Sequence, residues 1–323
     1  MPHLRRPLGS SGFEIAPVAL GCWPIAGMTT LGTSETDSIA TIQKCFDVGV
    51  NHLDTAYTYG PSGESEKLIR RALGSRRDEM VIATKCGIHY DGAEFVTDGR
   101  PDVLRRECDE SLRRLGTDRV ELLYLHSPDE KVPIEESAAA LGALLAAGKT
   151  RSIGASNCTL EQLEAFHAVT PLAAVQLPYN MLQRDVEQRT LPWCRENNVA
   201  VTVYWPLIKG LLAGKFARDH QFDQRDKRQT MPMYQGDEWQ KNQDFLDALR
   251  SAAALTGHSV AQLVINWTIH QPGITAALCG AKRPAQIEET AGAMLWSLTA
   301  EQQSLIAAAI AARGPAAVKR VFT

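Results

Sequence analysis

The sequence lacks the charge excess and the compositional bias that mark several classes of protein. Its 34 Lys and Arg residues stand against 37 Asp and Glu, a formal net charge of −3, so there is no overall basic character of the kind that binds phosphate backbones. Hydrophobic residues make up 44% and charged residues 22% of its 323 positions, close to the averages for globular proteins. These values exclude disordered and collagen-like classes, and we expect no nucleic-acid partner.

Closely spaced cysteines and long hydrophobic runs are also missing. None of the seven cysteines forms a C-x-x-C pair, which argues against a zinc ribbon or a disulfide framework and for reduced thiols. The longest run of small apolar residues, Ala138–Ala147, is interrupted by Gly142 and is much shorter than the roughly 20 residues of a membrane span. The opening residues, MPHLRRPLGSSGFEI, contain no apolar stretch of signal-peptide type. We expect a cytoplasmic protein with no membrane segment and no metal site.

Eight short apolar runs recur along the chain. Near-continuous apolar runs are typical of strands that are buried on both faces of a parallel sheet. The predicted strands are Val18–Trp23, His52–Ala56, Val81–Lys85, Glu121–His126, Ser152–Asn157, Ala174–Asn180, Ala200–Trp205 and Ile274–Gly280.

Segments with helical periodicity separate these runs. Helices are predicted from Pro101 to Gly116, from Pro133 to Gly148, after Ser34 as far as Gly49, and after Thr159, whose capping box would include Gln162. Regular alternation of strands and helices implies βα units with right-handed crossovers. Eight strands in a chain of this length predict an α/β protein with a closed (β/α)8 TIM barrel rather than an open sheet.

Three stretches lie outside this repeat. Residues 4–17, with Gly9 and Gly12 between short apolar pieces, predict an N-terminal β-hairpin before the first barrel strand. Residues 208–241 are polar and are interpreted as a mobile functional loop. The stretch Glu301–Ala312 predicts an extra C-terminal helix. Because no linker or internal repeat interrupts the pattern, we expect a single domain over residues 1–323.

Polar side chains end the otherwise apolar strands. They are Asp54 with Tyr57 and Tyr59 just after it, Lys85, His126, Ser156 with Asn157, Gln176 and Tyr204. Barrel active sites lie at the C-terminal ends of the strands, so these side chains would meet in one mouth. A lone lysine there is usually a solvated rim charge, and a lone histidine is usually structural. Here the lysine and the histidine would lie at the same end of the barrel as Asp54 and a tyrosine, which favours a catalytic site.

These residue types suit proton transfer to or from a carbonyl or alcohol oxygen. An ammonium group near a tyrosine lowers the tyrosine pKa, and Asp54 would keep Lys85 charged and oriented. His126 would donate a hydrogen bond to a substrate oxygen. Spacing alone does not decide whether Tyr57 or Tyr59 is the acid. The strand ends offer no activated Ser or Cys nucleophile and no pair of opposed carboxylates of glycosidase type, for which Asp129 is a weak substitute.

The stretch GVNHLDTAYTYGPSGESEKLIRRAL resembles the signature of the aldo-keto reductase superfamily, in which Asp-Thr-Ala is followed by a Tyr-Gly pair. VIATK resembles the family's catalytic-lysine strand, and LLYLHSPD its histidine strand. The similarity extends from the N-terminal hairpin to the helix near residue 291. It implies the (β/α)8 fold and a catalytic tetrad of Asp54, Tyr59, Lys85 and His126, with Tyr57 lining the substrate pocket.

The resemblance also implies a nicotinamide cofactor. IGASN and AVQLPYN imply that Ser156, Asn157 and Gln176 bind the carboxamide, and that Tyr204 stacks on the nicotinamide ring. Over the pyrophosphate the implied contacts are Pro206, Leu207, Gly210, Leu212 and Lys215, and around the adenosine half they are Gly280, Lys282, Arg283, Gln286, Glu289 and Thr290. The cations favour a 2′-phosphate, so we expect NADP and leave NAD open.

Two other nucleotide-binding motifs do not match. GLLAGK is not a P-loop, because Lys209 precedes Gly214 by five residues where a glycine is required and Phe216 replaces the Ser or Thr. No strand is followed by GxGxxG and a helix, so a Rossmann site is not expected. Departures from the family pattern are Trp205 in place of a common serine and Thr290 in place of a common asparagine.

The sequence predicts a small-molecule carbonyl substrate bound against Trp23, Tyr57, His126 and Trp205, with further walls from the loop Gly87–Arg100. The short segment after the last helix predicts an open pocket. The resulting hypothesis is an NADP-dependent reductase of aldehydes and ketones, sugar-like carbonyls included. Two alternatives stay open: an NAD(P)-dependent sugar or alcohol dehydrogenase working in the oxidative direction, and a cofactor-binding regulatory subunit like the channel β subunits. The oligomeric state is not predicted.

Overall fold

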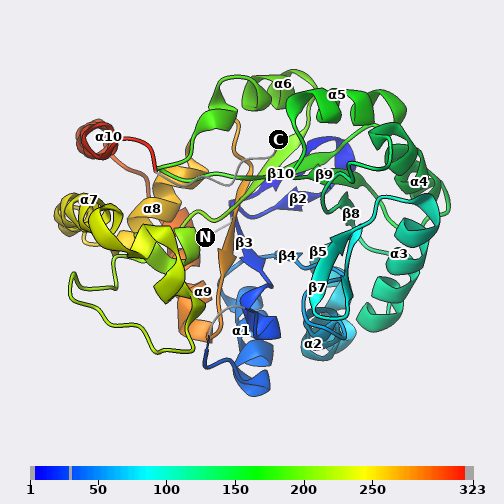
Figure 1. Ribbon diagram of the computed structural model, residues 1–323, viewed down its shortest axis with the longest axis horizontal. Coiled ribbons are helices and arrows are strands. Elements are labelled where there is room, and N and C mark those ends of the chain that lie inside the picture. The colour runs from blue at the N-terminus through cyan, green and yellow to red at the C-terminus, as the bar shows by residue number, and fades with distance from the viewer. Residues whose placement is uncertain (1–3, 29–30, 317–323) are drawn as a thin grey trace.

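Eight parallel strands close into a barrel in this computed structural model, which describes residues 4–28 and 31–316. The hydrogen-bonded order around the barrel is β3, β4, β5, β8, β9, β10, β11, β12 and back to β3. Helices surround the barrel on the outside (Figure 1). The structure therefore confirms the predicted (β/α)8 TIM barrel.

Each of the eight predicted apolar runs forms one barrel strand. The strands are β3 (Val18–Gly21), β4 (His52–Asp54), β5 (Val81–Cys86), β8 (Leu122–Leu125), β9 (Ile153–Ser156), β10 (Ala174–Pro178), β11 (Ala200–Tyr204) and β12 (Ala276–Gly280). The strands are buried almost throughout because helices pack against their outer faces, while their inner faces fill the barrel.

Ten α-helices form in the part of the chain that the structure describes. They are α1 (Glu35–Asp47), α2 (Glu64–Leu73), α3 (Pro101–Leu115), α4 (Ile134–Ala146), α5 (Leu160–Val169), α6 (Thr190–Glu196), α7 (Gly236–Ala254), α8 (Val260–Ile269), α9 (Pro284–Ala291) and α10 (Ala300–Arg313). Of these, α1, α3, α4 and α10 begin and end close to the predicted residues, α5 begins after Thr159 as predicted, and the other five have no predicted bounds. Short 3-10 turns are η1 (Gly9–Ser11), η2 (Pro24–Ala26), η3 (Gly74–Glu79), η4 (Asp185–Glu187), η5 (Ile208–Ala213), η6 (Lys227–Thr230), η7 (Pro232–Tyr234) and η8 (Gly292–Leu295). The Ser34 hydroxyl caps α1, and Thr159 and Gln162 form the expected capping box of α5.

The N-terminal hairpin closes the bottom of the barrel. Strands β1 (Arg6–Pro7) and β2 (Glu14–Ile15) pair antiparallel, as predicted. Leu8 and Ile15 pack with residues near the N-terminal ends of the barrel strands, among them Val81 and Leu122. Gly9 has a φ of +53°, and a Cβ there would lie 2.1 Å from the carbonyl oxygen of Ala173, so only glycine fits this approach. With this end covered, the opposite mouth is left for the site.

Two segments differ from the sequence prediction. Residues 208–241 are not one loop: η5, η6 and η7 occupy part of the segment, and residues 236–241 form the first part of the long helix α7. The loop Gly87–Arg100 contains a second hairpin, β6 (Ile88–Asp91) paired with β7 (Glu94–Thr97). The polarity of the first segment concealed the start of a helix, because the face that α7 buries against η7, α8 and α10 includes polar residues such as Asn242 and Gln243.

Across the described ranges, no helix combines the length and the apolar character that crossing a membrane requires.

Candidate active site

A buried ion pair lies at the centre of the barrel mouth. Asp54 ends β4 and Lys85 lies near the end of the neighbouring strand β5, so the parallel register brings the two side chains together. Lys85 Nζ donates to Asp54 Oδ1 at 2.6 Å and to the Thr55 carbonyl oxygen at 2.7 Å. The exposed fractions of the two side chains are 0% for Lys85 and 3% for Asp54. Burial lowers the pKa of Lys85, but the charge of Asp54, the nearby Tyr59 and the hydrogen bonds to both together outweigh it, and the pKa lies above its ordinary value.

The loop between β4 and α2 brings Tyr59 against this pair. Lys85 Nζ donates to the Tyr59 hydroxyl oxygen at 3.4 Å. The backbone of Tyr59 is held by hydrogen bonds from its N–H to the Ala56 carbonyl and from the Ser65 N–H to its own carbonyl. Burial raises the pKa of Tyr59 and the Lys85 charge lowers it; burial prevails, so the phenol is protonated at neutral pH.

His126, directly after β8, lies on the other side of Tyr59. The two rings meet edge to face, with centroids 6.0 Å apart and an angle of 71° between their planes. The His126 N–H donates to the Cys86 carbonyl, and its own carbonyl accepts from Asn157 Nδ2 at 2.7 Å. The structure thus brings together Asp54, Tyr59, Lys85 and His126, which the sequence placed at or just after the ends of three strands.

An aromatic wall continues from Tyr59. The Trp23 ring meets Tyr59 edge to face at 5.1 Å, and Phe95 of the β6–β7 hairpin lies 6.5 Å from Trp23. Tyr90 packs against Phe95 at 4.6 Å. Phe95 is 51% exposed although it is a large apolar side chain, so this end of the wall faces solvent. The predicted wall residue Trp23 and the predicted wall loop therefore lie beside the tetrad.

Tyr57 is oriented differently from the prediction. Its hydroxyl donates to Glu110 Oε2 at 2.6 Å, and the Arg114 guanidinium lies 4.2 Å above its ring. Burial and the Glu110 carboxylate raise the pKa of Tyr57 to about 12. The predicted place of Tyr57 in the substrate wall is thereby corrected: residues two apart point in different directions, and Tyr57 faces α3 while Tyr59 faces Lys85.

Polar groups from β9, β10 and β11 form a connected cluster beside the tetrad. Gln176 Nε2 donates to Asp54 Oδ2 at 2.7 Å, and Ser156 Oγ donates to the Gln176 carbonyl at 3.0 Å. The Tyr204 hydroxyl donates to Asn157 Oδ1 at 2.9 Å. Asn157 adopts the left-handed conformation with a φ of 61°, which turns its side chain between His126 and Tyr204. The predicted carboxamide-binding residues thus lie together, one of them bonded to Asp54.

The segment after β11 is bent sharply. Trp205, Ile208 and Lys209 all have left-handed backbone conformations, with φ values of 60°, 44° and 54°. Trp205 lies edge to face with the Tyr204 ring, and Lys209 Nζ lies 5.0 Å from the centre of the Trp205 ring. Such a cluster of strained non-glycine residues is typical of a functional loop.

The predicted pyrophosphate donors in this segment are engaged locally. The N–H groups of Gly210 and Leu212 both donate to the Leu207 carbonyl oxygen, at 2.9 and 3.1 Å. These bonds close the 3-10 turn on itself, and the phosphate contact of the two N–H groups stays a prediction. Pro206 is buried beside Leu207, and Lys215 Nζ lies 2.6 Å from Glu289 Oε2 of α9.

The predicted adenosine contacts divide into two groups. Lys282 Nζ donates to the Leu31 carbonyl at 2.6 Å, and Arg283, directly after it, precedes the first turn of α9. Gln286, by contrast, accepts the N–H groups of Lys282 and Arg283 as a helix cap. The Thr290 hydroxyl donates to the carbonyls of its own helix, so its predicted ligand contact is corrected: α9 turns that side chain inward.

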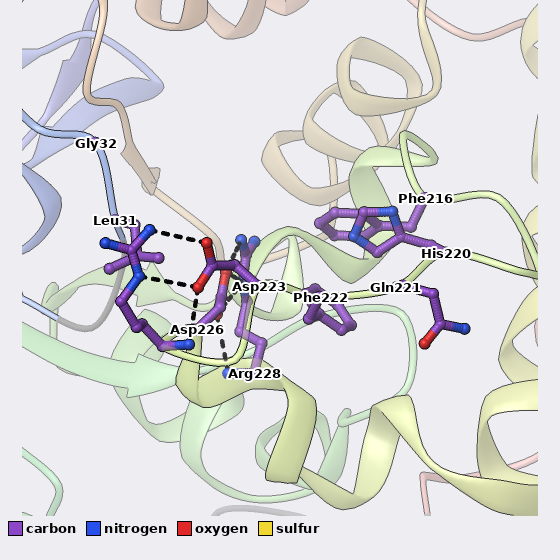
Figure 2. A pocket seen from close by; sticks show the side chains of 10 residues that line it. Leu31, Gly32, Phe216, His220, Gln221, Phe222, Asp223, Asp226 and Arg228 are labelled. Atoms are coloured by element: carbon purple, nitrogen blue, oxygen red, sulfur yellow. Dashed lines mark hydrogen bonds and ion pairs between the residues drawn. The ribbon is translucent and has the colours of Figure 1, made fainter.

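Next to Lys282 and Arg283 is a cavity of about 610 Å³ that the sequence analysis did not identify. Figure 2 shows the rings of Phe216, His220 and Phe222 at one end and acidic and basic side chains at the other. The charged groups form two ion pairs, Asp223 with Arg225 at 2.8 Å and Asp226 with Arg228 at 2.6 Å. The repeated Asp-x-Arg spacing in DQRDKR is the sequence signal for these two ion pairs, whereas the prediction rested only on the polarity of the segment. The remaining lining residues are Leu31, Gly32 and Gln221.

The charge at this cavity fits a phosphate-bearing ligand. Burial, together with the neighbouring guanidinium groups of Arg228 and Arg283, lowers the pKa of Lys282. Asp226 already pairs with Arg228, so the cations that an added anion would stabilise are Lys282 and Arg283. The residues present therefore fit the phosphorylated end of a dinucleotide.

Comparison with known proteins agrees with this geometry. The model of the aldo/keto reductase family matches residues 17–311. Aldo-keto reductase YhdN of Bacillus subtilis is 35% identical over 299 residues, covering 92% of this chain and 90% of that protein. The structure of the glycerol dehydrogenase AKR11B4 from Gluconobacter oxydans is 34% identical, with a TM-score of 0.89 and full coverage of both chains. That of aldo-keto reductase AKR11C1 from Bacillus halodurans is 25% identical, with a TM-score of 0.78 and 98% coverage of each chain. The chain belongs to the aldo-keto reductase family of oxidoreductases.

Proposed function

We propose that the protein reduces aldehyde and ketone carbonyls to alcohols with NADP as cofactor. The observation that carries the proposal is the buried Lys85–Asp54 pair with the Tyr59 hydroxyl 3.4 Å from the ammonium group. A protonated phenol next to a fixed positive charge is suited to give its proton to an oxygen that gains negative charge.

In this mechanism Tyr59 protonates the carbonyl oxygen as the carbon is reduced. Lys85 stabilises the phenolate that is left, and Asp54 keeps Lys85 charged and aimed at Tyr59. His126 donates a hydrogen bond to the same substrate oxygen and so orients the carbonyl group. When bound, the nicotinamide supplies the hydride, and this chain supplies orientation and electrostatics.

The cofactor would be held by two groups of residues. Ser156, Asn157 and Gln176 would bind the carboxamide, with Tyr204 against the ring. At the other end Lys282 and Arg283 would bind a 2′-phosphate, since adjacent cations with few carboxylate partners favour the more highly charged cofactor. This distribution supports NADP over NAD.

The test is oxidation of NADPH and NADH by the purified protein with a panel of aldehydes and ketones, alongside Y59F and Y57F. We expect consumption of NADPH by the wild type and by Y57F, and none by Y59F. Cofactor binding, followed by protein fluorescence, should be the same in all three. Retained turnover in Y59F would refute the role of Tyr59. Tight cofactor binding without turnover of any panel member or alcohol would favour the regulatory-subunit alternative.

Oxidation of a polyol is the second candidate function. It is favoured by the similarity to the glycerol dehydrogenase from Gluconobacter oxydans, which covers both chains fully. The same tetrad serves this direction, with Tyr59 accepting the alcohol proton. The specificity constant for glycerol with NADP⁺ at alkaline pH, compared with that for glyceraldehyde with NADPH at neutral pH, separates the two directions.

A further inference from the structure

A second buried ion pair lies behind the site, between helices α2 and α3. Arg114 Nη1 is 3.3 Å from Glu66 Oε2, and the exposed fractions of these side chains are 13% and 0%. The Thr84 hydroxyl donates to the other carboxylate oxygen, Glu66 Oε1, at 2.7 Å. Thr84 directly precedes Lys85 in β5, so the pair is fastened to the strand that carries the active-site lysine.

The other side of Arg114 holds the loop that carries Tyr59. Arg114 Nη1 donates to the Tyr57 carbonyl at 2.9 Å, and its guanidinium covers the Tyr57 ring. At the far end of the loop, Gly63 has a φ of +72°, and a Cβ there would lie 2.5 to 2.7 Å from the Arg114 side chain. One side chain therefore contacts the loop both before and after Tyr59.

This arrangement gives the loop its position relative to β5. The two backbone hydrogen bonds of Tyr59 join it to Ala56 and Ser65, close by in the sequence. These bonds shape the turn, but other contacts set the distance between the turn and β5. The Tyr57 N–H bonds to the Lys85 carbonyl at 3.0 Å, and Arg114 holds the opposite, carbonyl side of the same residue.

We propose that Arg114 and Glu66 are positioning residues, which set the separation between the Tyr59 hydroxyl and the Lys85 ammonium group. The inference rests on the proposed function, in which Tyr59 is the acid. Burial raises the pKa of Glu66, so a carboxylate is costly at this place, and a buried ion pair adds little stability over an apolar pair. Its specific contribution is geometric: a planar guanidinium bonds a carbonyl, a carboxylate and a ring face at once, which a lysine cannot do.

The variants are chosen to change geometry and to keep charge. R114K retains the positive charge but loses the bridge between Tyr57 and Glu66. T84V removes the hydrogen bond that fastens Glu66 to β5 and serves on its own should R114K fail to fold. R113K is the matched control, because Arg113 lies next to Arg114 on α3 but is 74% exposed, and its ion pair is a long one of 4.0 Å to Glu110.

Two readouts separate this inference from the proposed function. The first is the pKa of Tyr59, measured without substrate by NMR of protein labelled at tyrosine Cζ, with the signal assigned through Y59F. We expect that pKa to rise by about one unit in R114K, because the ammonium that lowers it lies farther away. The second is kcat for carbonyl reduction, which should fall about 10- to 100-fold, the cost of displacing reacting groups by about 1 Å, with cofactor Kd unchanged.

A rise in the pKa of Tyr59 in R114K or T84V, with no rise in R113K, supports the inference. It does so even if the wild type turns over no carbonyl, because missing turnover would refute only the proposed function. An unchanged Tyr59 titration in folded T84V and R114K overturns the inference, whatever their thermal stability, and leaves the proposed function in place.

Discussion

Lys85 Nζ lies 2.6 Å from Asp54 Oδ1 in a place that solvent does not reach. Removing two charges from water costs free energy, so the pair persists because additional hydrogen bonds satisfy both groups: the Thr55 carbonyl accepts from Lys85, and Gln176 donates to the second oxygen of Asp54. The pair thereby connects Tyr59, the proposed acid, to Gln176 on β10 and, through Gln176, to Ser156 on β9.

We predict that D54N loses both stability and turnover. Asparagine leaves a buried ammonium without its counter-charge, which typically costs about 3–5 kcal/mol of unfolding free energy. The pKa of Lys85 falls as a result, so the charge that stabilises the Tyr59 phenolate is lost. Urea unfolding and NADPH oxidation measure the two effects, and D78N is a surface control, because the Asp78 side chain is 83% exposed. Unchanged kcat in D54N would contradict the proposed role of the pair.

The alkaline stability of the protein should depend on the same pair. The folded-state pKa of Lys85 is raised, so the stability from its protonated form is fully present below the unfolded value of about 10.4. It is lost as the pH rises through the folded-state pKa. We expect the unfolding free energy to fall above about pH 10 in the wild type. D54N should lose the upper part of this dependence, as urea unfolding at a series of alkaline pH values would show; identical profiles would refute the linkage.

The sequence predicted that Asp54, Lys85 and His126 meet at one mouth because they end apolar strands, and the barrel rule places strand ends together. The choice of Tyr59 over Tyr57 followed from the resemblance to the aldo-keto reductase signature. Lys85, for example, follows four strand-forming residues, and the register with Asp54 follows from neighbouring parallel strands. The orientation of Tyr57 could not be predicted, since it depends on Glu110 and Arg114 in a helix some 50 positions later.

The cavity beside Lys282 also could not be predicted from local sequence patterns. Lys282 bonds the Leu31 carbonyl across 251 positions of sequence, and the cavity forms only where that segment meets residues 216–228. Local sequence patterns predict the strands and the helix caps, whereas contacts between distant loops depend on tertiary packing.

Y57F should differ from Y59F in every respect that matters to catalysis. The Tyr57 hydroxyl bonds Glu110 and not Lys85, so its loss removes one part-buried hydrogen bond to a carboxylate, worth about 1.5–3 kcal/mol of stability. We expect kcat within about twofold of the wild type at pH 7. A loss of turnover as large as that of Y59F would show that Tyr57 takes part in the chemistry.

Cofactor choice should depend on the cations at the cavity. We predict that R283A raises the Kd for NADPH about 10-fold or more and leaves the Kd for NADH nearly unchanged, because a charged hydrogen bond contributes about 1.5–3 kcal/mol and only NADPH carries the 2′-phosphate. Fluorescence titration with both nucleotides measures this. R225A, which also changes an arginine at the cavity, is the comparison, since Arg225 already pairs with Asp223. Equal weakening of both cofactors by R283A would contradict 2′-phosphate recognition.

The exposed ring of Phe95 predicts that the effect of its removal on KM depends on the size of the substrate. Phe95 continues the wall of Trp23 and Tyr59 but belongs to the β6–β7 hairpin, outside the barrel. A small aldehyde that reaches Tyr59 and His126 leaves Phe95 uncovered, whereas an aryl aldehyde extends over it and buries apolar area, at roughly 25 cal/mol per Å². We therefore predict that F95A raises KM for aryl aldehydes severalfold and leaves kcat/KM for glyceraldehyde unchanged. The comparison of KM with kcat across a series of aldehydes of rising size decides it: equal losses for small and large substrates would mean that the hairpin supports the fold of the site and does not contact the substrate.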